Sequence, residues 1–194
     1  MPQVLAYAAS VIAARLLVPA EFGAFGAMQG ITQIANPIGL AIQAIVARKL
    51  VKNFKKTHHD LLKFGLEVSI VVMIATIFIS FPLSTIFKID YLVLVLTLGA
   101  IAPFVFISTK LGIAQGKEFY LKLARIYIVF GIGRRILVII GLFIYPELIS
   151  VGIGFLGGTL ISAIVVHFIL GNSKKFWESQ RAKKHNEVNH FVSY

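Results

Sequence analysis

Six long apolar segments, separated by short polar gaps, are the feature that most constrains how this chain folds. An α-helix needs about 20 apolar residues to cross a hydrocarbon core ~30 Å thick. Charged residues make up only 14% of the chain, against about 25% in soluble domains. The pattern therefore predicts an all-α integral membrane protein, a bundle of six transmembrane helices.

The expected spans cover residues 3–18, 24–47, 61–87, 91–114, 125–145 and 148–170. The first is short by the length rule. The gaps are short as well, so neighbouring helices should run antiparallel. Residues 1–170 then form the bundle, and residues 171–194 form a basic cytoplasmic tail.

Positive charge crowds into every second gap. Fifteen of the nineteen Lys and Arg residues lie in 48–63, in 110–125 or after residue 170. Lys and Arg accumulate on the cytoplasmic side of membrane proteins, so we expect a multi-pass protein of the cytoplasmic membrane with both termini in the cytoplasm. The net charge of +11 then reflects topology. A nucleic-acid partner is not expected, because such a surface interleaves basic and aromatic residues on a soluble domain.

The sequence offers no motif for an enzyme. It has no cysteine, so disulfides, thiolate metal sites and cysteine nucleophiles are excluded. It has no Walker loop, dinucleotide fingerprint or nucleophile elbow, and no cluster has metal-ligand spacing. We therefore expect neither catalysis nor a metal or other cofactor. His167, near the end of the last span, could relay protons, although a lone histidine there is more often interfacial.

Prolines and small residues within the spans predict how the helices pack. Pro37 and Pro103 each remove a backbone donor and should kink their helices. Small residues four apart let membrane helices approach closely. Such rows occur in the sixth, second and first spans: Gly154, Gly158 and Ser162; Gly26 and Gly30; Ala6, Ser10 and Ala14.

Arg134 and Arg135 stand inside an apolar segment, about 14 Å from its expected start. An arginine at this depth costs roughly 2.5–3.5 kcal/mol on insertion scales, and no acidic residue is expected at the same depth. The planar guanidinium binds phosphate bidentately, so one reading is a cavity that receives an anionic ligand. The alternatives are that one arginine reaches an interface, or that both bind carbonyls freed by the kinks.

The second span carries four polar amides at steps of four, three and seven, namely Gln29, Gln33, Asn36 and Gln43. These steps place all four on one helix face. Such a stripe should face the bundle interior or water. It is either a cavity wall that hydrogen-bonds sugar hydroxyls or a set of interhelical hydrogen bonds, worth ~0.6 kcal/mol each in a membrane.

Two stretches carry a resemblance to a known family. Residues 15–23 read Arg-Leu-Leu-Val-Pro-Ala-Glu-Phe-Gly. They resemble the Arg-Leu-Leu-x-Pro-x-Glu-Phe-Gly link between the first two helices of polysaccharide flippases of the O-antigen and teichoic-acid type, in the multidrug, oligosaccharidyl-lipid and polysaccharide exporter superfamily. Residues 115–119, Gln-Gly-Lys-Glu-Phe, are similar to the Gln-Gly-x-x-Phe turn after helix four in that group.

The resemblance implies one lobe of a two-lobe flippase. Members have twelve to fourteen helices in two bundles around a central cavity, and this chain looks like the N-terminal bundle alone. Residues 190–194 resemble the lead-in to helix seven. The implied function is translocation of a lipid-linked oligosaccharide, with membrane lipids, that substrate and a second half or a second copy as partners.

Two other functions remain open at this point. One is a multidrug cation antiporter of the same superfamily, although a cation site needs a buried Asp or Glu and none is expected at depth. The other is a non-transporting membrane fragment or accessory subunit. Under the flippase reading Arg134 or Arg135 attracts the diphosphate, and the polar stripe of the second span meets sugar.

Overall fold

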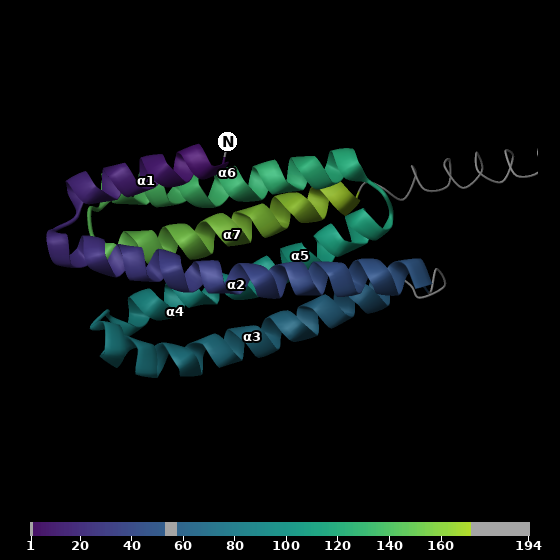
Figure 1. Ribbon diagram of the computed structural model, residues 1–194, viewed down its shortest axis with the longest axis horizontal. Coiled ribbons are helices and arrows are strands. Elements are labelled where there is room, and N and C mark those ends of the chain that lie inside the picture. Colours follow the sequence, from purple (N-terminus) through teal and green to yellow (C-terminus); the bar gives the residue numbers. More distant parts are fainter. Residues whose placement is uncertain (1, 53–57, 172–194) are drawn as a thin grey trace, which may run out of the picture.

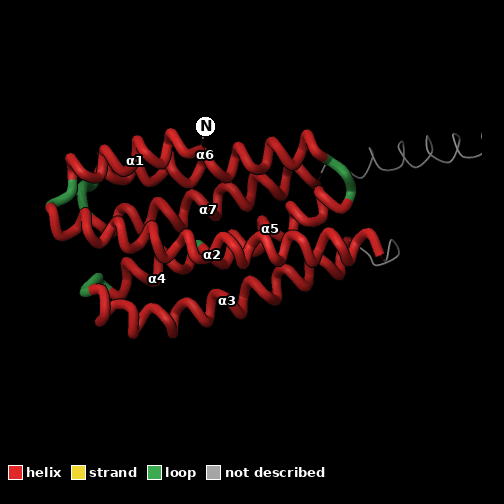
Figure 2. Tube along the Cα trace, in the orientation of Figure 1, coloured by secondary structure: helices red, strands yellow, loops and turns green. Residues whose placement is uncertain are grey.

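A computed structural model describes residues 2–52 and 58–171 of the chain. The expected tail at 171–194 therefore lies, apart from its first residue, outside the described residues. All regular secondary structure in the described part is helical (Figures 1 and 2). The helices are α1 (Pro2–Leu16), α2 (Pro19–Lys52), α3 (His58–Phe87), α4 (Tyr91–Gly99), α5 (Ile101–Gly116), α6 (Tyr120–Ile144) and α7 (Leu148–Gly171).

Within residues 2–52 and 58–171, five stretches are long and apolar enough to cross a membrane, in agreement with five of the six expected spans. They are Pro19–Val51, Asp60–Phe87, Tyr91–Gly116, Tyr120–Ile144 and Leu148–Leu170. Helix α1 has 15 residues and so reaches only about 23 Å. The chain is thus a multi-span helical membrane protein, and a sixth span through α1 remains a prediction.

The span Tyr91–Gly116 is broken at Ala100, between α4 and α5. Pro103 has no N–H to donate to the carbonyl of Gly99, and its ring crowds that carbonyl. The chain tightens there, with the Ala100 N–H bonded to the Thr97 carbonyl at 3.3 Å. The kink expected from Pro103 is confirmed. Pro37 and a further proline, Pro82, lie within continuous helices.

The helices join at two opposite ends of an elongated bundle (Figure 1). At one end, here called the turn end, short connections link α1 to α2, α3 to α4 and α6 to α7. The other is called the basic end, because the expected cytoplasmic charge lies there. Its described basic residues are Arg48, Lys49, Lys52, Lys63, Lys117, Lys122 and Arg125. Helices α2, α5 and α7 run toward the basic end, and α1, α3 and α6 run away from it.

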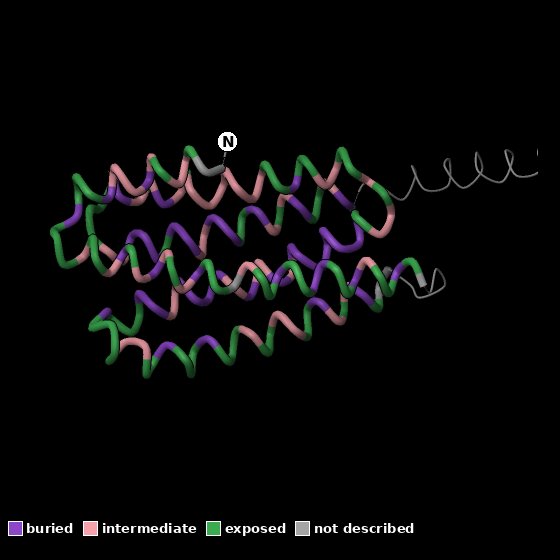
Figure 3. The backbone as a smooth tube through the Cα atoms, in the orientation of Figure 1, coloured by how far each residue is buried: buried purple, intermediate pink, exposed green. Residues whose placement is uncertain are grey.

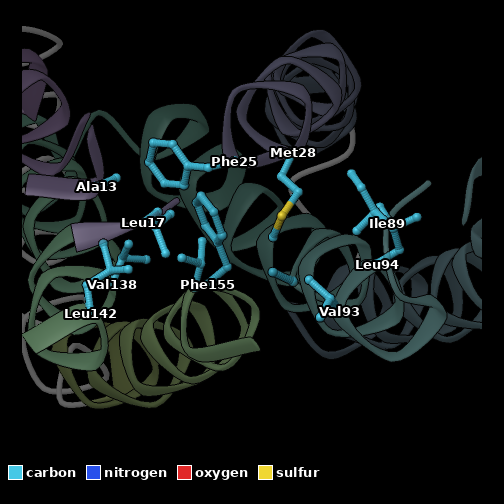
Figure 4. Packing of buried hydrophobic residues seen from close by; sticks show 12 residues of the cluster. Ala13, Leu17, Phe25, Met28, Ile89, Val93, Leu94, Val138, Leu142 and Phe155 are labelled. Atoms are coloured by element: carbon cyan, nitrogen blue, oxygen red, sulfur yellow. The ribbon is translucent and has the colours of Figure 1, made fainter. Parts of the chain in front are cut away.

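Three apolar clusters form the core. The largest lies toward the turn end and joins α1, α2, α4, α6 and α7 (Figure 4). Phe25, Met28 and Phe155 contribute its largest side chains. Toward the basic end, one cluster joins α5 to α2 and α3, and another joins α5 to α6 and α7. Helix α4 therefore packs in one half of the bundle and α5 in the other.

Helices α6 and α7 approach each other most closely along a row of small residues. A Cβ added at Gly154 would lie 2.7 Å from the Cα of Val138, and one at Gly158 would lie 2.5 Å from the Cα of Arg134. Neither glycine therefore has room for a side chain. The helix contact expected from the Gly154 row is confirmed. The row at Gly26 and Gly30 makes no such contact, because nothing lies within 4 Å of either position.

The outer surface is apolar, most clearly on α3 (Figure 3). Large exposed side chains on this helix include Ile70, Val71, Ile74, Phe78, Ile79 and Phe81. Soluble monomers rarely expose a continuous apolar patch larger than a few hundred Å². A lipid environment accounts for this surface, because hydrocarbon tails solvate such side chains.

Candidate functional site

Gln43 ties three helices together by hydrogen bonds. Its Nε2 donates to Gln115 Oε1 of α5 at 2.8 Å, and its Oε1 accepts from the Tyr127 hydroxyl of α6 at 2.9 Å. Gln43 is buried, with 7% of its surface exposed. Of the two readings of the polar stripe, Gln43 thus shows the interhelical one.

Two glycines in α5 allow α2 to approach closely where Gln43 makes these hydrogen bonds. A Cβ at Gly112 would lie 2.5 Å from the Gln43 carbonyl oxygen, and one at Gly116 would lie 3.0 Å from the carbonyl of Ala47. The backbones of α2 and α5 therefore almost touch. This approach brings the two glutamines within hydrogen-bond distance, and a larger residue at 112 would separate them.

The rest of the stripe continues along α2 without reaching another helix through a described hydrogen bond. Asn36 Nδ2 donates to Gln33 Oε1 at 2.5 Å. Gln33 is exposed, while Gln29 and Asn36 are half-buried. Two amide groups that bond each other retain further donors and acceptors. This part of α2 therefore offers hydrogen-bonding groups on an open face.

Arg134 lies within three residues of the midpoint of α6. Its guanidinium carbon stands 5.0 Å from the ring centre of Phe155 and 5.7 Å from that of Phe130. Both distances suit cation–π attraction, which offsets part of the cost of a charge at this depth. Among the described residues, no carboxylate lies within 4.0 Å of Arg134 to form an ion pair.

Arg135 is the neighbouring residue and is also half-buried. Successive residues point about 100° apart on a helix, so the two side chains leave α6 in different directions. The structure thus separates a pair that the sequence treats as equivalent. Only Arg134 has aromatic rings beside its guanidinium in the described part of the chain.

Arg134 and Asn36 lie at the same height in the bundle. Helices α2 and α6 run in opposite directions, and Tyr127 meets Gln43 across them. Arg134 is seven residues beyond Tyr127, and Asn36 is seven residues before Gln43. At 1.5 Å per residue, each step covers about 10.5 Å. Arg134 and Asn36 therefore share one level near the middle of the spans, and the rest of the amide stripe extends above and below it along α2.

A hollow of about 400 Å³ opens at the basic end, next to the Gln43–Gln115 contact. Its lining consists of Ala47, Arg48, Val51, Gln115, Gly116, Glu118 and Tyr120. Glu118 has φ 60°, a left-handed conformation that costs a residue with a side chain roughly 1–2 kcal/mol. Of the site residues expected from the sequence, none lines this hollow.

A second polar contact lies between α5 and α7. Lys110 Nζ is 3.0 Å from His167 Nδ1 and 5.1 Å from the ring centre of Phe106. The sequence counts Lys110 with the positive charge of residues 110–125, although it lies near the end of the expected span 91–114. The structure buries it inside α5 with 3% of its surface exposed. In the sequence, the position of Lys110 six residues before the turn at Gly116 is what indicates that it lies inside the helix.

Comparison with protein-family models, curated proteins and solved structures finds no match to this chain. The helices and their apolar surface define its class, a multi-span helical membrane protein. Arg134 and the amide stripe of α2 are the features that bear on its function.

Proposed function

We propose that the chain is one half of a transporter that moves lipid-linked oligosaccharides across the membrane. The observation that carries this proposal is Arg134, a cation at mid-span height with no described carboxylate partner, level with Asn36 in the amide stripe of α2. An anion-binding group level with the middle of a row of sugar-binding groups matches the two chemistries of such a substrate. The likeness of residues 15–23 to polysaccharide flippases supports the same reading.

Each part of the substrate has a group that suits it. A diphosphate supplies negative charge to pair with the Arg134 guanidinium, which has no described carboxylate partner. The guanidinium fork binds phosphate oxygens in pairs. Gln29, Gln33 and Asn36 carry amide donors and acceptors for sugar hydroxyls. The polyprenyl tail stays in lipid, beside the apolar outer helices.

The proposal needs a second bundle. Alternating access works by rocking one repeat or bundle against another around a shared site. The exposed amide of Gln33 on α2 gains nothing from hydrocarbon, and unsatisfied polar groups there are costly. A second half or a second copy of this chain would cover that face and close the cavity.

Binding of a polyprenyl-diphosphate oligosaccharide to the chain in nanodiscs tests the proposal. Native mass spectrometry gives the affinity, and the same lipid without its diphosphate is the reference. We expect Arg134→Gln to weaken binding by tenfold or more, which is about 1.4 kcal/mol. Arg134→Lys should restore binding only in part, because a point charge lacks the fork.

Lys49→Gln is the matched control, since Lys49 also lies over an aromatic ring, Phe64, at 4.8 Å but stands at the basic end. Its affinity should equal that of the unchanged chain. Equal affinities for the lipid with and without diphosphate would refute the proposal. So would an Arg134→Gln chain that binds as tightly as the unchanged one.

A further inference from the structure

Lys110 and His167 form an isolated polar pair on the side of α5 that faces α7. Their contact joins residues 57 positions apart. Lys110 is buried, whereas His167 is exposed and lies four residues before the end of α7. At 1.5 Å per residue, His167 is about 6 Å from that end of the helix. The pair thus connects an enclosed amine to the surface near the basic end.

No described acidic group neutralises this amine. Helices α2, α3, α4, α6 and α7 pack against α5. The charged residues that these helices and the turn after α5 place in the basic half are Arg48, Lys49, Lys52, Asp60, Lys63, Glu67, Lys117, Glu118, Lys122 and Arg125. None of the described carboxylates lies within 4.0 Å of the Lys110 amine. The described neighbours of the amine are the imidazole of His167 and the ring of Phe106.

The burial of Lys110 limits which ligands can reach its amine. A phosphate or a carboxylate group would have to displace His167 or part the helices to reach an amine that is 3% exposed. A proton needs no such space, because an imidazole can take it up at one nitrogen and release one at the other. His167 presents Nδ1 to Lys110, which leaves Nε2 for exchange with water at the basic end.

We propose that Lys110 and His167 together form a proton-binding site that holds one exchangeable proton inside the bundle. In the loaded form the Lys110 ammonium donates to Nδ1, and the neutral imidazole carries its hydrogen on Nε2. In the empty form Nδ1–H donates to the lone pair of the neutral amine. One hydrogen bond joins the two residues in both forms.

The proton balance of this exchange is complete. Unloading moves a proton from Lys110 Nζ to Nδ1, and the imidazolium then releases the proton on Nε2 to water. Loading is the reverse. The pair changes its charge from plus one to zero, and the imidazole changes its tautomer. A state with both groups protonated would oppose two donors and two positive charges at 3.0 Å and would break the contact.

This site is independent of the proposed transport function, because it needs only the Lys110–His167 contact. Coupling of a proton to movement of α5 against α7 would be its use in a transporter. Its test therefore measures the tautomer of His167, with no substrate present. A failure of oligosaccharide binding would leave this result unaffected.

The experiment is ¹⁵N NMR of the full chain in nanodiscs, with the histidine rings labelled. His167→Gln identifies the His167 signals among those of five histidines. As the pH rises, we expect the neutral Nε2–H tautomer of His167 to give way to the Nδ1–H tautomer. Lys110→Arg should hold the Nε2–H tautomer throughout, because a guanidinium does not deprotonate in proteins.

Lys49→Arg makes the same change at an exposed lysine, and the tautomer switch should persist in it. The unchanged chain alone can overturn the proposal, if its neutral His167 keeps one tautomer over the whole titration. A switch that survives Lys110→Arg would overturn it as well, because the proton would then come from a group other than Lys110.

Discussion

The Tyr127 hydroxyl donates a hydrogen bond of 2.9 Å to Gln43 Oε1, although 84 residues separate the two. Through this bond α6 is fixed to α2, while the amide nitrogen of Gln43 fixes α2 to α5 by way of Gln115. The bond also sets the height of Arg134 relative to Asn36. Stability and site geometry therefore depend on the same side chain.

Replacing Gln43 by leucine should lower the stability of the bundle. The change removes both hydrogen bonds of the buried Gln43, one to Gln115 and one to Tyr127. Interhelical hydrogen bonds in membranes average ~0.6 kcal/mol each, so we expect a loss of about 1 kcal/mol. Equilibrium unfolding in mixed micelles measures the difference.

Tyr127→Phe is the control for this variant, because it removes one of the two bonds and keeps the ring. It should cost about half as much as Gln43→Leu. The double variant should cost no more than Gln43→Leu alone, since the shared bond is lost only once. Full additivity of the two losses would show that the bond contributes nothing.

The contact between α6 and α7 should be sensitive to one added methyl group. Gly158→Ala would place its Cβ 2.5 Å from the Cα of Arg134, so the helices must move apart. Overpacking of this kind costs typically 1–3 kcal/mol. Gly157→Ala is the matched control on the same helix, because nothing lies within 4 Å of that position.

Thermal unfolding of the two alanine variants gives the comparison. Gly157→Ala should equal the unchanged chain or exceed it slightly, since alanine favours the helix over glycine by about 1 kcal/mol. Two variants of equal stability would contradict the close packing of α6 on α7.

The start of α4 should depend on the carboxylate of Asp90. Its Oδ1 accepts the N–H of Leu92 at 2.7 Å and so caps the helix. Asp90→Ala should destabilise the chain by about 1 kcal/mol, while Asp90→Asn should retain most of the cap. Chemical unfolding of the two variants distinguishes them, and equal losses would mean that charge rather than capping matters.

The basic end should face the cytoplasm. Because the chain has no native cysteine, single-cysteine variants report the side without background. Lys88→Cys at the turn end should react with an impermeant maleimide added to intact cells, and Lys56→Cys should react only after the membrane is opened. The reverse pattern would overturn the orientation inferred from charge.

The order of the spans and the break at Pro103 could be predicted from local sequence. Apolar length sets a span, and the missing N–H and the ring of Pro103 favour a break one turn before it. The same rule does not separate Pro103 from Pro37 and Pro82, which lie within continuous helices. Helix ends were less predictable. Helix α6 begins at Tyr120, five residues before the expected start at 125. Lys122 and Arg125 reduce the hydropathy there but are good helix formers, so the helix continues where the apolar run does not.

The partners of polar side chains could not be predicted in the same way. The sequence places Gln43 on a polar face, but its bonds to Gln115 and Tyr127 depend on how three helices lie together. Lys110 lies near the end of an expected span, and its contact with His167 depends on where α7 lies. Small residues are equally ambiguous, since the Gly154 row packs and the Gly26 row does not.

The break at Ala100 separates α5 from α4 and leaves α5 as a short helix with its own contacts to neighbouring helices. This segment of 16 residues carries Gln115, which holds α2, and Lys110, which holds α7. Helix α4, on the other side of the break, belongs to the apolar cluster of the turn end. A tilt of α5 about Ala100 would pull on α2 and α7 together and leave the turn end at rest. Pro103 thus divides one span into a segment bonded to α2 and α7 and a segment packed in the apolar cluster of the turn end.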